Sequence, residues 1–235
     1  MHYHNLQIIG TSHIAEQSIK EIQKAFEEPP TIVALELDKN RLYSLIHPEV
    51  KKAGFFEISK VAGVRGALFA VIARWAQGHF GKQVGIEPGS DMLTAFKLAH
   101  KHKAKLALID QPIELTLQNL SREFTFREKA LLVWDIIRSP FGGEKMSIDL
   151  RKVPEKKLIS ELLEKLKIRY PSLYKVLVED RNRHMARRLR VLMDSNPTDR
   201  ILAVIGAGHA EGVSKILRAS ESTASHSWSV EPHNI

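Results

Sequence analysis

The sequence predicts an α/β protein in which a mainly parallel sheet is flanked by helices and an all-helical insertion precedes the last strand. Three observations support this prediction: short runs of Val, Ile and Leu, helical periodicity between these runs, and a stretch from 113 to 196 without any strand pattern. Alternating strands and helices favour parallel pairing with helices on both faces. With 235 residues, 43% of them hydrophobic, the chain can bury a substantial core. We expect a single domain over residues 1–218.

The predicted strands are short runs rich in branched apolar residues, which is the pattern of strands buried on both faces. Segments with helical periodicity lie between them in the first half of the chain. The strands are predicted at Leu6–Ile9, Thr31–Leu37, Gln83–Ile86, Lys105–Ile109 and Arg200–Ile205, and the helices of the first half at Ala15–Glu28, Val61–Gly78 and Met92–His102.

The insertion at 113–196 is predicted to be entirely helical before the last strand begins. Pro171 and Pro197 bracket its final helix, as prolines often do at helix boundaries. Residues 219–235 are rich in serine at their start and lack periodicity, so we expect a flexible tail. The parts of the insertion are a helix around Arg127–Ile137, a loop at Ser139–Val153, an amphipathic helix at Glu155–Ile168 and a long helix at Leu173–Asp194.

Composition and charge exclude several kinds of site. The chain has no cysteine, which excludes disulfides, thiolate zinc sites, iron–sulfur clusters and a cysteine nucleophile. The net charge is +8, and nearly all of the excess lies in residues 151–218. Such a surface attracts nucleic acid, anionic lipid or an acidic substrate. Nucleic acid is disfavoured as a partner, because no aromatic residues are interleaved among Arg183, Arg187 and Arg190.

No segment of the sequence predicts a membrane span. The most apolar stretch, Val61–Phe80, is interrupted by Arg65 and Arg74, whereas a spanning helix needs about 20 apolar residues. Met1–Asn5 has neither the basic nor the apolar region of a signal peptide, so we expect a cytoplasmic chain. Val61–Phe80 is interpreted as a lid, as core or as the contact surface of a homodimer.

Each predicted strand ends in a glycine turn or an acidic residue. In open α/β sheets the ligand crevice lies at the carboxyl ends of the strands, so these segments should converge although they span most of the chain. Two of them are near copies, Gly10–His13 and Gly206–His209, which place a histidine three residues after a glycine that ends a buried strand. The acidic strand ends are Glu36, Asp38, Glu87 and Asp110.

Two histidines aimed over one sheet edge, with carboxylates nearby, predict nitrogen and oxygen ligands for Zn, Mn, Co or Fe. One open coordination position would make this site catalytic, with Glu36, Asp38 or Asp91 as general base or as partner of a ligand. A structural alternative stays open for each residue. The histidines are then hydrogen-bonding turn residues, Glu36 and Asp38 cap the next helix, and Glu87 serves a plain turn.

The predicted helix Leu173–Asp194 carries Arg181 near the centre of its apolar stripe. An arginine that faces a core is costly unless it is paired, so we expect Arg181 to meet a buried carboxylate or a substrate anion. Arg183, Arg187 and Arg190 are predicted on the opposite, solvated face. The stripe consists of Tyr174, Leu177, Val178, Met185, Leu189 and Leu192.

The glycines after the last strand also suggest a dinucleotide site, but their spacing argues against one. Gly206–Gly212 reads GxGxxxG, whereas the dinucleotide fingerprint is GxGxxG. The acidic residue expected about 20 positions later would fall in the tail. We therefore predict no dinucleotide cofactor.

In chain order, the motifs of this sequence resemble those of the TraB/PrgY family, over about residues 6–218. The resemblance implies an α/β core shared with the distantly related TIKI proteases, erythromycin esterases and haem-binding ChaN proteins. The sequence departs from the family's pattern after the fourth strand, where Asp110 is followed by Gln111–Pro112, and before the helical arginine, where Asp180 replaces a glutamate. The matching motifs are Gly10–His13, Leu35–Asp38 with Arg41, Gly85–Met92, Leu108–Asp110 with Thr116–Leu117, Asp180–Asn182 with Met185–Ala186, and Gly206–His209.

The resemblance implies a metal-dependent hydrolase that acts on a peptide or other small amide, since TIKI proteins are metal-dependent proteases. The alternative is a non-catalytic peptide-binding regulatory module like PrgY, which dampens peptide-pheromone signalling. Many relatives carry carboxy-terminal membrane helices, so the chain is expected to be a soluble member or the soluble part of a membrane-anchored protein. The divalent ion (Mn, Co or Zn) is assigned to His13, His209 and Glu87, and the catalytic roles to Glu36, Arg41 and Arg181.

Overall fold

The computed structural model describes residues 1–11, 15–47, 89–138 and 155–226. Within these residues a five-stranded sheet has the order β1-β2-β5-β3-β4. Strands β2, β5, β3 and β4 are parallel, and only β1 runs antiparallel, against β2. This confirms the mainly parallel sheet. The strands are β1 (His2–Tyr3), β2 (Leu6–Thr11), β3 (Ile32–Leu35), β4 (Lys105–Leu108) and β5 (Ile201–Gly206). The strand expected at Gln83–Ile86 lies outside the described residues.

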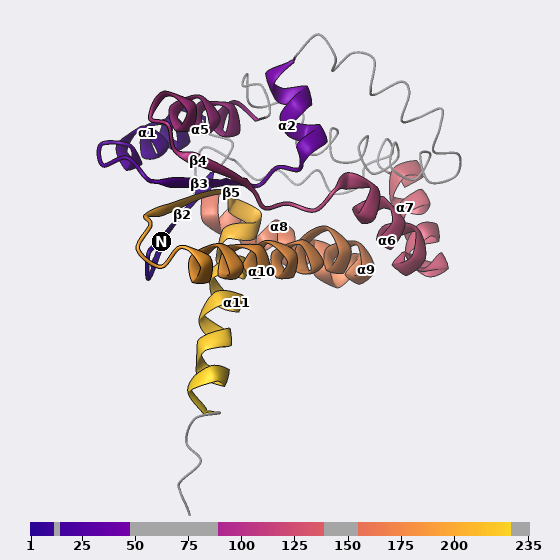
Figure 1. Ribbon diagram of the computed structural model, residues 1–235. Coiled ribbons are helices and arrows are strands. Elements are labelled where there is room, and N and C mark those ends of the chain that lie inside the picture. The colour runs from indigo at the N-terminus through magenta and orange to yellow at the C-terminus, as the bar shows by residue number, and fades with distance from the viewer. Residues whose placement is uncertain (12–14, 48–88, 139–154, 227–235) are drawn as a thin grey trace, which may run out of the picture.

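Helices cover both faces of this sheet (Figure 1). One face packs against α1 (Ala15–Ala25), α2 (Lys39–Ile46) and α5 (Ser90–Lys101), and the other against α10 (Asp180–Ser195) and α11 (Ala207–His226). Strand β5 shows why both faces are apolar. Leu202 and Val204 join the first core, whereas Ile201, Ala203 and Ile205 join the second, because successive side chains point to opposite faces.

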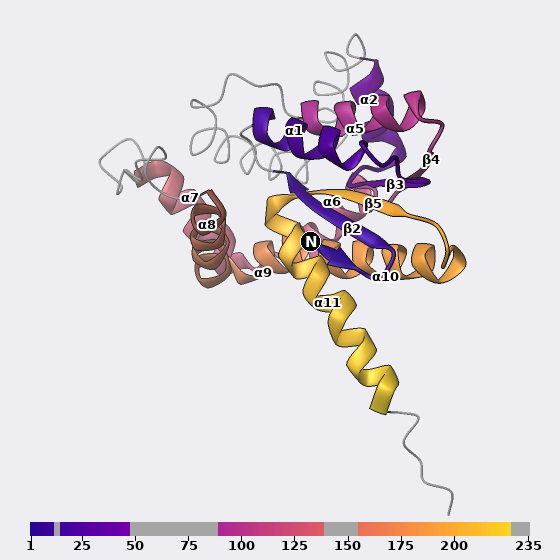
Figure 2. The same cartoon turned by 90° about the vertical axis from the view of Figure 1, so that its left-hand side faces the viewer.

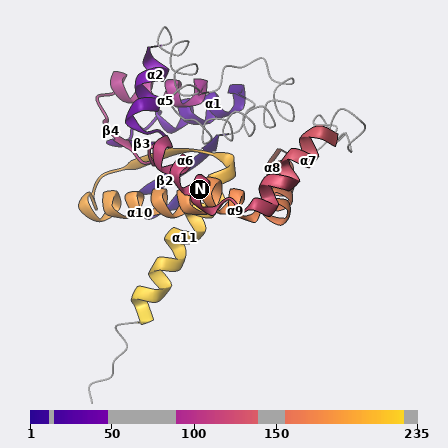
Figure 3. The same ribbon diagram turned by 90° about the vertical axis from the view of Figure 1, so that its right-hand side faces the viewer.

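The remaining helices form the predicted insertion and share a smaller apolar core (Figure 3). The described parts of residues 113–196 are mainly helical, as expected, and the expected loop at Ser139–Val153 lies outside the described residues. The helices are α6 (Ile113–Glu123), α7 (Phe126–Arg138), α8 (Glu155–Arg169) and α9 (Pro171–Tyr174), followed by the π-helical turn η2 (Lys175–Glu179) and α10. The small core contains Leu120, Phe124, Leu132, Tyr170, Leu173 and Val176.

The last helix of the insertion differs from the uniform helix predicted at Leu173–Asp194. It begins at Pro171 and ends at Ser195, and η2 interrupts it near its start, after the first four residues. Arg190 also departs from the prediction of a solvated side chain. Its Nη2 donates to the hydroxyl of Tyr3 at 2.9 Å and to the carbonyl of Leu217 at 3.1 Å, so it ties α10 to β1 and α11.

Helix α11 extends past the predicted end of the domain at residue 218. It runs away from the sheet (Figure 2), and residues 219–226 of the expected tail are helical. Among the residues that the structure describes, no helix combines the length and the apolar character needed to span a membrane. The Val61–Phe80 stretch lies outside those residues.

Candidate functional site

The parallel strands end at one edge of the sheet, and three polar residues meet there. Leu35 of β3 pairs with Val204 of β5 and with Leu108 of β4, so the three strands end side by side. Glu36 directly follows β3, Asp110 comes shortly after β4, and His209 lies in the first turn of α11 after β5. The expected convergence of residues far apart in sequence is thus confirmed for these three strand ends.

Arg181 joins the three strand ends. Its Nη2 donates to Glu36 Oε1 at 2.5 Å and to Asp110 Oδ2 at 2.7 Å, and its Nε donates to Asp110 Oδ1 at 3.1 Å. Its Nη1 lies 3.0 Å from His209 Nε2. The side chain is only 16% exposed, so two carboxylates neutralise a largely buried guanidinium. The prediction that Arg181 meets a buried carboxylate is confirmed.

The π-helical turn η2 directly precedes Arg181. In this turn the N–H of Asp180 bonds to the carbonyl of Lys175, five residues back. Because this turn is wider than an α-helical turn, the side chains that follow it point in a different direction around the helix axis than they would in a regular α-helix. Arg181 also donates from Nη1 to the carbonyl of Leu177 at 3.4 Å, within the same turn. The backbone that carries the arginine therefore helps to hold its guanidinium.

His209 is fixed in one tautomer by its neighbours. A guanidinium only donates hydrogen bonds, so Nε2, facing Arg181, must carry the lone pair. Nδ1 then carries the proton and donates to Asn182 Oδ1 at 2.7 Å. Burial lowers the pKa of His209, the charge of Glu36 opposes this effect, and the charge of Arg181 adds to it. The net shift is downward from 6.5, which favours the neutral imidazole.

Asn182 reaches His209 across a helix contact that requires glycine. A Cβ at Gly212 of α11 would lie 2.2 Å from Asn182 Nδ2 and 3.0 Å from its Cγ. The side chain of Asn182 therefore occupies the space that any larger residue at 212 would fill. Asn182 itself is buried at the start of α10. This contact between the two helices places the amide against the imidazole.

The two carboxylates are held by donors on both of their oxygens. Glu36 Oε2 accepts from the N–H of Gly206 at 2.6 Å, while Oε1 accepts from Arg181. Asp110 Oδ2 also accepts from Arg41 Nη1 at 2.6 Å, and Oδ1 from the N–H of Gln111 at 2.9 Å. Burial raises the pKa of Asp110, but Arg181, Arg41 and the Gln111 N–H together outweigh burial and leave that pKa below 3.8.

Asp38 caps the next helix, which is the structural alternative that the sequence left open for it. Its Oδ1 accepts from the N–H groups of Asn40 and Arg41, at 2.8 and 3.0 Å, and so caps α2. For Glu36 the capping alternative is wrong, since its oxygens bind Gly206 and Arg181 instead. Asp38 Oδ2 is buried and has no hydrogen-bond partner among the residues that the structure describes. A buried acceptor without a donor is rare in folded proteins.

The structure therefore brings together four of the six predicted site residues: Glu36, Arg41, Arg181 and His209. His13 and Glu87 lie outside the described residues, and no group of three or more potential metal ligands occurs within those residues. Thr11, two positions before His13, pairs with Gly206, three positions before His209. Strands β2 and β5 thus end beside each other.

Sequence reasoning did not assign site roles to Asp110 and Asn182. Asp110 could be recognised in the sequence as an acidic residue at the end of a strand. Its pairing with both arginines, however, depends on side-chain geometry. Asn182 had a weaker signal, its position next to Arg181. Its partner on another helix, His209, could not be read from helix periodicity.

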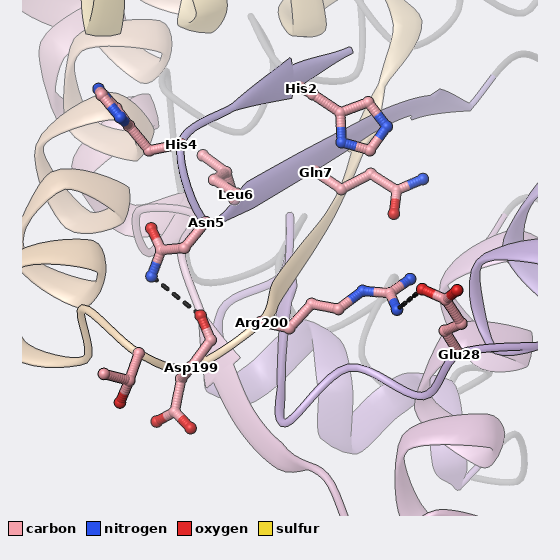
Figure 4. A pocket seen from close by; sticks show the side chains of 9 residues that line it. His2, His4, Asn5, Leu6, Gln7, Glu28, Asp199 and Arg200 are labelled. Atoms are coloured by element: carbon pink, nitrogen blue, oxygen red, sulfur yellow. Dashed lines mark hydrogen bonds and ion pairs between the residues drawn. The ribbon is translucent and has the colours of Figure 1, made fainter.

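A shallow polar hollow occurs at the opposite edge of the sheet, where β2 and β5 begin (Figure 4). Two pairs of its polar groups bind each other. Asn5 Nδ2 donates to the carbonyl of Asp199 at 2.9 Å, and Arg200 pairs with Glu28 at 2.7 Å. The charged cluster around Arg181 is therefore the stronger candidate site.

Fold and site together define an α/β protein with a buried charged cluster at the carboxyl edge of its sheet. The chain belongs to the TraB/PrgY/gumN family, because the sequence model of that family matches residues 3–224. It is 35% identical over 224 residues to an uncharacterized protein of Methanocaldococcus jannaschii, an alignment that covers 92% of this chain and 54% of that protein.

The chain is also similar to mammalian proteins. It is 25% identical to a human TraB domain-containing protein and 24% identical to its mouse counterpart. Both alignments cover 88% of this chain and 61% of the relative. The chain thus spans between about half and three fifths of the length of the curated relatives it matches.

Proposed function

We propose that this chain is a metal-dependent hydrolase that cleaves a peptide or other amide bond at the carboxyl edge of the sheet. The observation that carries the proposal is the geometry of His209: a largely buried imidazole whose Nδ1 contacts Asn182 and whose Nε2 faces a charged cluster. In its neutral form such an imidazole can bind a divalent ion or accept a proton.

One contact of His209 supports the proposal of a divalent ion. In metal sites a ligating imidazole usually donates its other N–H to a protein acceptor, as Nδ1 donates to Asn182 here. His209 would hold the ion together with the predicted ligands His13 and Glu87. The buried Asp38 Oδ2, which lacks a donor within the described part of the chain, adds an acceptor at the same strand edge. A bound ion would lower the pKa of water and polarise the carbonyl of the substrate.

The other residues have separate roles in this proposal. Glu36 Oε1 lies 3.6 Å from His209 Nε2, so Glu36 is assigned to accept the proton of the attacking water. Arg41 is 46% exposed and donates to Asp110 through Nη1, which leaves part of its guanidinium facing solvent. We assign Arg41 to the oxyanion that develops on the substrate. Arg181 holds both carboxylates in position. We also propose that the α/β core of this chain is the one shared by TIKI and ChaN proteins.

The test is cleavage of a defined peptide library, followed by mass spectrometry, with Mn²⁺, Co²⁺ or Zn²⁺ present and with a chelator. We expect cleavage by the wild type with at least one ion, and a loss of about a hundredfold or more in His209→Ala. His100→Ala, an exposed histidine of α5, is the matched control and should cleave normally. Absence of cleavage with all three ions, or full cleavage by His209→Ala, would contradict the proposal.

One observation favours a second candidate, a peptide-binding regulatory module. Each carboxylate oxygen of Glu36 and Asp110 already accepts at least one hydrogen bond, so both side chains are fixed in position, as in a site that binds without catalysing a reaction. Arg41 would then capture the carboxylate of a peptide. Peptide binding that survives a chelator, is lost in Arg41→Gln and shows no turnover would favour this function over hydrolysis.

A further inference from the structure

We propose that the substrate of this chain is an acidic peptide, and that Arg188 and His184 of α10 bind one of its carboxylate side chains. The inference rests on the proposed function, because it names the substrate class of the same site. It adds two specificity-determining residues and the place of the acidic residue in the peptide.

The charges of the site itself are balanced. Two carboxylates, Glu36 and Asp110, pair with two guanidinium groups, Arg181 and Arg41. Every oxygen of these carboxylates already accepts a hydrogen bond from within the chain. Any further positive charge beside the site therefore needs an acidic partner from elsewhere.

Further basic residues follow on the same side of α10. Positions 181, 184 and 188 are three and four apart, so Arg181, His184 and Arg188 lie in a row along one side of the helix. His184 is half-buried and Arg188 is exposed. Neither side chain has a hydrogen bond or an ion pair with any residue that the structure describes. This basic row thus continues the site without a partner of its own.

The surroundings of His184 connect this basic row to the site. Burial and the charge of Arg188 lower the pKa of His184, the charge of Asp110 opposes this effect, and the charge of Arg187 adds to it. His184 is therefore within electrostatic reach both of a carboxylate of the site and of two exposed arginines. A carboxylate bound between Arg188 and His184 would offset the repulsion among these groups.

The length of the basic row sets the place of the acidic residue in the peptide. Seven positions of an α-helix, from Arg181 to Arg188, cover about 10 Å. An extended peptide advances about 3.3 Å per residue, so this distance corresponds to about three residues. Arg41, assigned to the reacting carbonyl, is bound to Asp110 at the other end. We therefore expect the acidic residue about three positions from the cleaved bond.

A peptide fits the basic row better than nucleic acid does. Helix α10 contains no Phe, Tyr or Trp on which bases could stack. Nucleic-acid binding also depends on several phosphate contacts at once. Arg183 and Arg190 of the same helix are already bound within the chain, which leaves few free cations on α10.

The experiment is retention of random decapeptides on the immobilised whole chain, with a chelator present and near physiological ionic strength, followed by mass spectrometry. We expect the peptides retained by the wild type to be enriched about threefold or more in Asp and Glu. Arg188→Gln should lose most of this enrichment. No enrichment with the wild type, or the same enrichment with Arg188→Gln, would overturn the inference.

Arg183→Gln is the matched control, because it removes one positive charge from the same helix. Arg183 is 58% exposed and pairs with Glu179 and Asp180, on another side of α10 from Arg188. This variant should retain acidic peptides as the wild type does. An equal loss in Arg183→Gln and Arg188→Gln would show a general effect of charge and would overturn the assignment of Arg188.

A second measurement uses the wild type alone and so does not depend on the folding of variants. One retained peptide is labelled and compared, by fluorescence polarisation, with the same peptide carrying Gln in place of each acidic residue. The Gln peptide should bind about tenfold more weakly. Equal affinities, or tighter binding of a short oligothymidylate than of the acidic peptide, would overturn the inference.

The two proposals fail separately. Retention is measured with a chelator and needs no cleavage, so an acidic preference without turnover would contradict the proposed hydrolysis and support the acidic ligand. Cleavage of peptides without any acidic preference would do the reverse. Where cleavage occurs, the acidic residue should lie about three positions from the cut, and cuts unrelated to acidic residues would overturn the inference.

Discussion

Nη2 of Arg181 lies 2.5 Å from Oε1 of Glu36, although 145 positions separate the two residues in the sequence. This contact joins the end of β3 to the first turn of α10. Asp110 extends the network to β4, and His209 extends it to α11. One side chain thus connects most of the elements that form the carboxyl edge, so its loss affects both the stability of the fold and the geometry of the site.

Arg181→Met is expected to destabilise the chain by about 3–5 kcal/mol, because it leaves Glu36 and Asp110 buried without their shared cation. Arg183→Met is the control on the same helix. Arg183 is 58% exposed and pairs with Asp180 and Glu179 near solvent, so its loss should change the free energy of unfolding by less than about 1 kcal/mol. Urea unfolding at pH 7 measures both, and equal effects would contradict the structure.

The stability contributed by His209 depends on pH. Burial and the charge of Arg181 lower its pKa in the folded chain despite the opposing charge of Glu36, whereas the unfolded chain binds a proton near pH 6.5. The contribution is therefore fully present above pH 6.5 and is lost as the pH falls toward the lower folded pKa. The maximum slope is about 1.4 kcal/mol per pH unit.

The measurement compares urea unfolding of the wild type and His209→Gln at pH 7.5 and at pH 5.5. The stability advantage of the wild type should shrink at the lower pH. His100→Gln serves as the control, because His100 is exposed. A difference between wild type and His209→Gln that stays constant with pH would refute the assignment of a depressed pKa.

Gly212→Ala is expected to disturb the site through Asn182. The new Cβ would overlap the amide of Asn182 at 2.2 Å, so Asn182 must move away from His209. We expect a destabilisation of about 1–3 kcal/mol, together with a mixed imidazole tautomer in nitrogen NMR. Gly208→Ala is the matched control on the same helix, since its Cβ would meet only Leu163 Cδ1 at 4.0 Å. A single unchanged tautomer in Gly212→Ala would count against the role of Asn182.

Deleting Lys175 should convert the π-helical turn into a regular α-helical turn. The residues on the two sides of the deletion would then rotate relative to each other by about 100°, so Arg181 cannot face Glu36 while α9 keeps its packing. We expect a loss of stability comparable to that of Arg181→Met. Lys175→Ala keeps the chain length and should change stability by less than about 1 kcal/mol. An unaffected deletion variant would show that the turn does not position Arg181.

The sequence predicts the sheet well because buried parallel strands are continuous apolar runs. Four of the five predicted strands match observed ones, and the fifth lies outside the described residues. The placement of Glu36, Asp110 and His209 at one edge follows from the shared direction of those strands. The buried pairing of Arg181 follows from its position on an apolar helix stripe.

What the sequence does not predict depends on contacts between elements. The π-helical turn has no known residue signature here, and Asn182 finds its partner only because α10 and α11 pack at Gly212. Arg190 belonged to a predicted solvated face, yet it binds Tyr3 and Leu217, since the packing of β1 and α11 brings acceptors within its reach. The two-residue strand β1 is too short for periodicity to detect.

The most direct measurement of the central claim is the protonation state of His209 by nitrogen NMR at pH 7, with its signals assigned by comparison with His209→Gln. The account predicts a neutral imidazole with the proton on Nδ1 and the lone pair on Nε2. A doubly protonated ring, or a proton on Nε2, would contradict it, because such a ring can neither accept from Arg181 nor bind a divalent ion through Nε2.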